Sequence, residues 1–233
     1  MRLILFDIDG TILLTDGAGR RAIHRALLEE IGTAGPIDSY RFDGKTDPQI
    51  VRELLAHADH PDAGRADRVQ AVCDRYLGLL EAELASPAQQ TRVMAGVMEL
   101  LAALVEAESE RRALVGLLTG NIERGAALKL HSAGIASSRF AVGAYGSDAA
   151  HRPDLPAIAR RRAEALLGAP LSGRDVVIVG DTPDDVACAR PIEARTVAVA
   201  TGHYDQAALR AAGATHVFPD LSDTRAVLDA LLA

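Results

Sequence analysis

Short runs of apolar residues alternate with segments of helical periodicity along most of the chain. The runs, each followed by a turn and a helical pattern, are Leu3–Phe6, Leu114–Leu118, Phe140–Ala144, Val176–Val179 and Thr196–Ala200, with Thr215–Phe218 as a weaker sixth. Runs this short and continuous are typical of strands that are buried on both faces. Because helices connect them, the strands are expected to lie parallel, with right-handed crossovers. The pattern therefore predicts an α/β protein with a doubly wound, mostly parallel sheet.

One long segment interrupts this alternation. Between the first and second strands the apolar residues follow helical spacing, in stripes at Ile23, Leu27 and Ile31, at Ile50, Val51, Leu54 and Leu55, and from Val69 to Leu84. A further helix at about Val97–Glu106 leads back to the sheet. We therefore expect a Rossmann-like core made of residues 1–14 and 89–233, with a helical cap domain inserted at residues 15–88.

Composition and charge narrow the functional classes. The 233 residues are 48% hydrophobic and 24% charged, as in ordinary globular proteins, with a formal net charge of −7 and no basic tract. This charge disfavours nucleic-acid binding. The N-terminal apolar run is too short for a signal peptide or a membrane span, and the two isolated cysteines, Cys73 and Cys188, are expected to be buried free thiols. We expect a cytoplasmic protein without a membrane partner, a monomer by default, with a homodimer left open.

Carboxylates gather at the predicted ends of two strands. Asp7 and Asp9 directly follow the first strand, and Asp181, Asp184 and Asp185 follow the fourth. In open α/β sheets the carboxyl ends of the strands share one edge, where ligands bind. Several negative charges at that edge are unfavourable without a cation, and Mg²⁺ prefers such oxygen ligands. The spacing predicts a Mg²⁺ site with Asp181 as the first-choice ligand of its cluster, and Asp185 is preferred over Asp184 for a second position.

Two further segments are suited to binding phosphate. Thr119, Gly120 and Asn121 lie between the second strand and the next helix, where a hydroxyl, a glycine and a helix N-terminus can receive an anion. For Thr119 alone, an ordinary helix N-cap explains the residue equally well. Arg152 follows the third strand, where its guanidinium can neutralise phosphoryl oxygens and hold Asp7 ionised.

Taken in order, these residues match the four signature motifs of a known enzyme family. The segment Asp7–Thr11 matches DxDGT, Thr119 the strand-end threonine, Arg152 the basic residue, and Gly180–Asp185 the GDxxxD motif. The chain thus resembles the haloacid dehalogenase-like hydrolases. Because the helical insert lies between the first two motifs, it is most similar to their phosphoglycolate-phosphatase-like branch.

The resemblance implies a role for each matching residue. Asp7 would be the nucleophile that forms an aspartyl-phosphate, and Asp9 would be the general acid and base. Asp7, the backbone carbonyl of Asp9 and Asp181 would hold Mg²⁺, while Thr119 and Arg152 would bind the phosphoryl group. An aspartate at the Asp9 position also argues against dehalogenases and phosphonate hydrolases, which lack it.

One motif departs from the family pattern. The basic residue is usually the lysine of Lys-Pro, and here it is Arg152, followed by Pro153. Because only two of the 25 Lys and Arg residues are lysine, we expect arginine to serve in its place. Lys129, the lysine nearest in sequence, lies well inside the helix after the second strand and is a poor substitute.

Two cationic residues of the insert are candidates for substrate contacts. Lys45, in a glycine-containing loop, is interpreted equally well as a substrate contact and as a solvated lysine. Arg20 is a weaker candidate, since a surface charge at a helix start explains it better. His203, after the fifth strand, is expected to be an ordinary loop histidine.

We therefore expect a Mg²⁺-dependent phosphatase, a phosphoric monoester hydrolase that acts on a small phosphorylated metabolite such as phosphoglycolate or a sugar phosphate. A phosphomutase of the same family, similar to the β-phosphoglucomutases, is an alternative that requires a phosphoenzyme protected from water. A non-catalytic binding protein on this fold is the second alternative. It predicts the loss of a motif acid, and none is missing.

Overall fold

A computed structural model, which describes residues 1–233, contains one six-stranded sheet with the order β5-β4-β1-β6-β7-β8. All neighbouring strands in this sheet are parallel. The strands are β1 Arg2–Phe6, β4 Ala113–Leu118, β5 Val142–Ala144, β6 Val176–Gly180, β7 Arg195–Val199 and β8 His216–Phe218. The predicted doubly wound α/β fold is confirmed, and every predicted strand is present.

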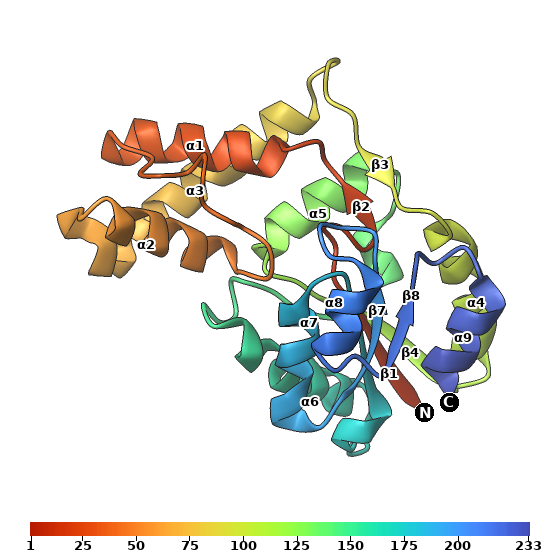
Figure 1. Cartoon of the computed structure of the whole chain (residues 1–233). Coiled ribbons are helices and arrows are strands. Elements are labelled where there is room, and N and C mark those ends of the chain that lie inside the picture. Colours follow the sequence, from red (N-terminus) through yellow and green to blue (C-terminus); the bar gives the residue numbers. More distant parts are fainter.

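Helices cover both faces of the sheet (Figure 1). They are α4 Val97–Ser109, α5 Glu123–Ser132, α6 Leu155–Leu167, α7 Pro183–Ala189, α8 Gln206–Ala211 and α9 Thr224–Leu232. Short 3₁₀ turns connect these elements at Ser137–Arg139, Arg152–Asp154, Gly173–Asp175 and Arg190–Ile192. The sequence predicts that the third strand begins at Phe140, but β5 begins at Val142, because the 3₁₀ turn at Ser137–Arg139 lies directly before it.

The central strand β1 shows why its apolar run is continuous. Leu3 and Leu5 belong to a hydrophobic cluster with residues of α6 and α7, while Ile4 and Phe6 belong to another with residues of α4 and α9. Successive side chains of a strand point to opposite faces, so a strand covered on both faces needs apolar residues at every position. Burying one such side chain stabilises the fold by roughly 1.5–3 kcal/mol.

The first part of the segment between β1 and β4 forms a separate helical layer beyond the carboxyl ends of the strands (Figure 1). It contains α1 Ala18–Ile31, α2 Asp47–His57, a 3₁₀ turn at Pro61–Gly64 and α3 Ala66–Leu84. These elements enclose their own hydrophobic cluster, which includes the free thiol of Cys73. Cys188 is also buried and free, in the sheet core.

A two-stranded antiparallel ribbon joins the helical layer to the core. Its strands are β2 Leu13–Leu14, where the chain leaves the core, and β3 Arg92–Val93, where it returns. We propose that this ribbon is the junction of the two domains, next to the boundaries that the sequence predicts at residues 15 and 88. Among the helices of the structure, none combines the length and the apolar character needed to cross a bilayer.

Candidate active site

The loop after β1 carries Asp7 and Asp9 to the carboxyl edge of the sheet. The Asp7 N–H donates to the Val179 carbonyl at 2.8 Å, which ties the loop to β6. Gly10 follows with a φ of +81°, and a Cβ at this position would lie 2.3 Å from a carboxylate oxygen of Asp181. Only glycine fits both this backbone conformation and this approach. The turn therefore brings Asp181 beside the residues that follow β1.

Three buried carboxylates meet at this edge. Ligand oxygens of Asp7, Asp181 and Asp185 all lie within 4.8 Å of one another. Burial raises the pKa of Asp7 to about 7, although the Arg152 guanidinium opposes the shift. Burial, together with the charges of Asp185 and Asp7, raises the pKa of Asp181 to about 9. Thr11 donates to Asp181 at 3.2 Å. When ionised, these three carboxylates carry more negative charge than the nearby cationic side chain balances. Their oxygen atoms are the kind of ligand that a hard divalent cation prefers.

Arg152 supplies the fixed positive charge of the cluster. Its Nη2 lies 3.2 Å from Oδ2 of Asp7 and donates to Oδ1 of Asp185, and all three side chains are buried. Although burial by itself lowers the pKa of Arg152, the carboxylates of Asp185 and Asp7 keep it above its ordinary value. The guanidinium therefore lies beside Asp7, but in the metal-free protein it does not hold Asp7 ionised as expected, because burial outweighs its effect on the pKa of Asp7.

Both carboxylate oxygens of Asp185 accept hydrogen bonds from protein groups. Besides the bond from Arg152 to its Oδ1, its Oδ2 accepts from the Thr182 N–H at 3.0 Å and from the Thr182 hydroxyl at 2.7 Å. The Thr182 hydroxyl in turn accepts from the Asp185 N–H, which completes a capping box at the start of α7. Asp184, at the same helix start, is exposed. Asp185 thus holds Arg152 and α7 in place, and ligation of a metal would compete with these bonds.

Thr119, Gly120 and Asn121 follow β4 and line the same cavity as Asp7. Thr119 Oγ1 accepts from the Asn121 N–H at 3.3 Å and from its side-chain amide at 2.8 Å. The same amide donates to Oδ2 of Asp9 at 2.7 Å. A Cβ at Gly120 would lie 2.0 Å from the Lys45 carbonyl, so glycine is required where the cap loop approaches.

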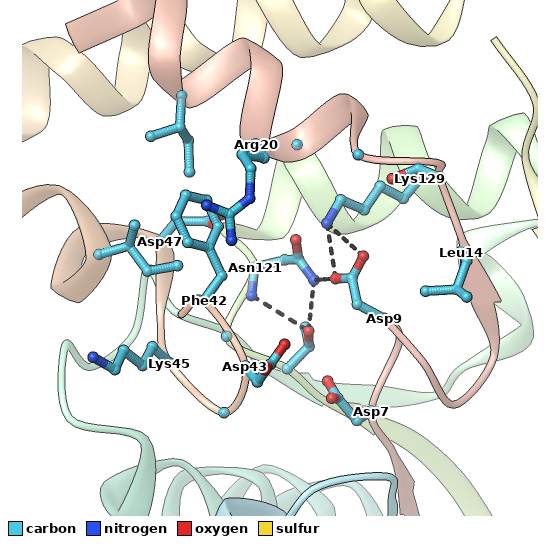
Figure 2. Close-up of a pocket in the computed structure, with 18 of the residues that line it drawn as sticks. Asp7, Asp9, Leu14, Arg20, Phe42, Asp43, Lys45, Asp47, Asn121 and Lys129 are labelled. Carbon is cyan, nitrogen blue, oxygen red and sulfur yellow. Dashed lines mark hydrogen bonds and ion pairs between the residues drawn. The ribbon is translucent and has the colours of Figure 1, made fainter. Parts of the chain in front are cut away.

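Lys129 reaches the site from the second turn of α5, a contact that the sequence analysis did not anticipate. Its Nζ lies 2.8 Å from both carboxylate oxygens of Asp9, above the position of Asp7 (Figure 2). It therefore contacts Asp9, while Arg152 occupies the position beside Asp7. A signal was present in the sequence: the rarity of lysine that drew attention to Lys45 applies equally to Lys129.

Asp47, at the start of α2, is a second residue that sequence reasoning missed. It is buried, its N–H donates to the Gly120 carbonyl at 2.8 Å, and its Oδ2 accepts from the Ile122 N–H at 2.9 Å. Burial raises the pKa of Asp47 to about 6, although Lys129 opposes the shift. Thr46 also donates to the Ala150 carbonyl at 2.7 Å. The cap loop is thus attached to two core loops beside the phosphate-binding residues.

The two cap candidates line the cavity, but both are engaged by cap groups. Lys45 donates to the Tyr40 hydroxyl and to Oε2 of Glu53, the latter at 2.7 Å, and points away from Asp7 (Figure 2). Arg20 donates to the Tyr40 carbonyl at 3.0 Å, and its guanidinium lies 4.1 Å from the centroid of the Phe42 ring. Their assignment as substrate contacts stays a prediction.

The loops of core and cap together enclose one cavity of about 550 Å³. Asp7, Asp9 and Arg152 line its core side, and most of the other lining residues are polar or glycine. His203, which belongs to the α/β domain and is largely exposed, also lines the cavity. Its Nδ1 lies 3.5 Å from Oδ1 of Asp43 in the cap loop. A cavity of this size accommodates a small organic molecule.

In the metal-free protein, we expect the melting temperature to fall as pH rises from about 6 to about 9. The pKa values of Asp7 and Asp181, about 7 and about 9, are higher in the folded chain than in the unfolded chain. The folded chain therefore binds more protons over this range, and the stability present at low pH is lost as these groups ionise. Added Mg²⁺ should restore the melting temperature most strongly at high pH.

Scanning fluorimetry in EDTA and in Mg²⁺ measures both effects. Asp181→Asn is the matched control, because it removes the carboxyl with the higher pKa and should flatten the pH dependence in EDTA. A wild-type melting temperature that is independent of Mg²⁺ at pH 9 would contradict the expectation.

Comparison with known proteins supports the fold and relates part of the chain to one family. Residues 151–224, which include Arg152, Asp181 and Asp185, match the HAD-hydrolase-like family model. A hydrolase from Pseudomonas syringae superposes with a TM-score of 0.73 at 21% identity, over 99% of each chain. CbbY from Rhodobacter sphaeroides, crystallised with phosphate, has a TM-score of 0.66 at 20% identity, over 96% of each chain.

A predicted phosphoglycolate phosphatase from Haemophilus somnus has a TM-score of 0.69 at 17% identity, over 98% of each chain. No sequence among the curated proteins matches. The family match and the shared fold confirm the resemblance to the haloacid dehalogenase-like hydrolases that the motifs predict.

Proposed function

We propose that this protein is a Mg²⁺-dependent phosphatase that hydrolyses a small phosphomonoester through an aspartyl-phosphate on Asp7. One observation carries the proposal: the buried Asp7 carboxylate lies 3.2 Å from the Arg152 guanidinium and within 4.8 Å of the Asp181 carboxylate, at a cavity that the cap covers. A carboxylate beside a guanidinium, with room for a bound anion, is suited to attack on phosphorus. The match of residues 151–224 to a hydrolase family supports this chemistry.

The reaction consists of two displacements at phosphorus. An oxygen of Asp7 attacks the phosphoryl group, the bond from phosphorus to the ester oxygen breaks, and Asp9 transfers a proton to the departing alkoxide. Water then attacks the aspartyl-phosphate while Asp9 removes a proton from it, and the bond to Asp7 breaks to release inorganic phosphate. Arg152 stays beside the phosphoryl oxygens throughout and balances their charge. Thr119 and Asn121, at the end of β4, orient the phosphoryl group and Asp9.

The metal would be held by Asp7 and Asp181, with the backbone carbonyl of Asp9. The raised pKa values of the two carboxyls support this assignment, because they indicate a site that lacks positive charge. When bound, Mg²⁺ would supply charge neutralisation for the transferring phosphoryl group. We assign Asp185 to positioning Arg152 and α7, since both of its carboxylate oxygens already accept hydrogen bonds from the protein.

The cavity lining favours a small polar substrate. Ile23, Phe42 and Ile50 contribute apolar surface on the cap side, but charged and polar side chains predominate around them. Such a lining suits a phosphorylated acid or sugar better than a phospholipid. The fold shared with a predicted phosphoglycolate phosphatase and with a protein crystallised with phosphate supports the same substrate class.

The purified protein is expected to release 4-nitrophenol from 4-nitrophenyl phosphate in millimolar Mg²⁺ and to lose this activity in EDTA. Absorbance at the wavelength of 4-nitrophenolate measures the rate, and added Mg²⁺ should restore it. Turnover that EDTA leaves unchanged would contradict the metal assignment, and the absence of turnover would contradict the phosphatase. A screen of phosphorylated acids and sugars then ranks substrates. Phosphate transfer that requires a bisphosphate activator would identify a mutase.

A further inference from the structure

The carboxylate of Asp9 is held by three hydrogen bonds from core residues. Lys129 donates to both of its oxygens at 2.8 Å, and the Asn121 amide donates to Oδ2 at 2.7 Å. The Asp9 side chain is otherwise 41% exposed at the wall of the cavity. Without these donors it would be free to rotate, because few other groups restrain an exposed aspartate.

The cap encloses Lys129. Its side chain is only 7% exposed, although it lies on α5 of the core. A Cβ on Gly19, in the first turn of α1, would lie 3.5 Å from Nζ and 3.8 Å from the hydroxyl of Tyr76. That hydroxyl is buried on α3, which packs against α5, and has no hydrogen-bond partner. Because the cap excludes water from the ammonium group, its attraction to Asp9 is stronger than in an open site.

We propose that Lys129 is a positioning residue that directs the Asp9 carboxylate toward the ester oxygen of the substrate. This inference rests on the proposed phosphatase function and deepens it. Lys129 acts through Asp9, and Gly19 and Tyr76 of the cap shield its ammonium group from water. Cap closure is therefore coupled to correct placement of the group that transfers the proton. Misplacement of a catalytic group by about 1 Å can lower the rate by roughly 100-fold.

Two aryl phosphates separate this role from a structural one. Phenol, with a pKa of about 10, needs a proton as it departs, whereas 4-nitrophenolate departs readily without one. The two substrates differ only by a nitro group, so they test the proton transfer with nearly the same fit to the cavity. The ratio kcat/KM reports the steps up to release of the alcohol, so water attack on the aspartyl-phosphate does not contribute.

Lys129→Met is expected to lower kcat/KM for phenyl phosphate by roughly 30-fold, and for 4-nitrophenyl phosphate by less than about 3-fold. Lys129→Arg, which retains paired N–H donors for a carboxylate, should restore part of the phenyl phosphate rate. Arg124→Met is the matched control. It removes another α5 cation that pairs with the cap, through Glu81 at 2.8 Å, but is largely exposed, so both rates should stay unchanged.

Equal losses with the two substrates, or no loss with either, would overturn the positioning role. Should Lys129→Met fail to fold, Lys129→Gln applies the same comparison with an uncharged donor, and the same selective loss is expected. If the proposed phosphatase function is wrong, the result differs: the wild-type protein itself hydrolyses neither aryl phosphate. That result would also exclude the positioning role of Lys129.

Discussion

Asp7→Asn is expected to lower kcat for 4-nitrophenyl phosphate by roughly 10⁴-fold or more. The amide has nearly the same shape as the carboxylate but lacks the negative charge, so its oxygen is a far weaker nucleophile toward phosphorus. Asp7 is also a proposed metal ligand, so the substitution weakens two functions at once. Steady-state release of 4-nitrophenol in saturating Mg²⁺ measures the loss.

Two controls separate this loss from damage to the fold. Asp154→Asn removes a largely exposed carboxylate two residues beyond Arg152 and should retain the wild-type rate. The melting temperature of Asp7→Asn in EDTA at pH 8 should not fall, because burial raises the pKa of Asp7 to about 7 and so disfavours its ionised form. A folded Asp7→Asn protein that retains a tenth of the wild-type rate would exclude Asp7 as the nucleophile.

Arg152→Met is expected to destabilise the metal-free protein by about 3–5 kcal/mol, and to remove most activity. The methionine leaves Asp7 and Asp185 buried without the guanidinium that contacts both of them. Arg152→Lys keeps the charge but cannot reproduce the planar geometry of the guanidinium, so it should lie between wild type and Arg152→Met. Urea unfolding followed by circular dichroism at pH 8 measures these differences.

A surface arginine provides the comparison for this effect. Arg162 pairs with Asp148 at 2.6 Å, but its side chain is 45% exposed, so Arg162→Met should cost about 1 kcal/mol or less. If Arg152→Met proved no more destabilising than Arg162→Met, Arg152 could not be the compensating charge of the acidic cluster.

The sheet could be predicted because its signal is local in the sequence. A strand covered on both faces requires an uninterrupted apolar run, and β1 and β6 both have one. Parallel strands also end at the same edge of the sheet, so residues that directly follow those two strands had to lie near one another. This is why the sequence alone predicts that Asp7 and Asp181 lie near one another.

Side chains that reach the site from the middle of a helix, or from the cap, could not be predicted in this way. Lys129 contacts Asp9 only because α5 starts at the sheet edge and the lysine side chain extends back along it. Asp47 binds the start of α5 only because the cap loop folds onto Gly120. Periodicity describes which face of a helix is apolar, but not which distant element that face meets.

The parallel sheet, the helical insert and the identity of the acids at the strand ends thus follow from local apolar runs and the motifs beside them. The partners of those acids depend on packing between segments more than a hundred residues apart, such as Asp9 and Lys129. Lys45 differs, because its charge is taken up by Glu53, a residue nearby in the sequence of the cap. Burial and competing ion pairs decide which cations face the cavity, because they set each group's desolvation and its nearest opposite charge.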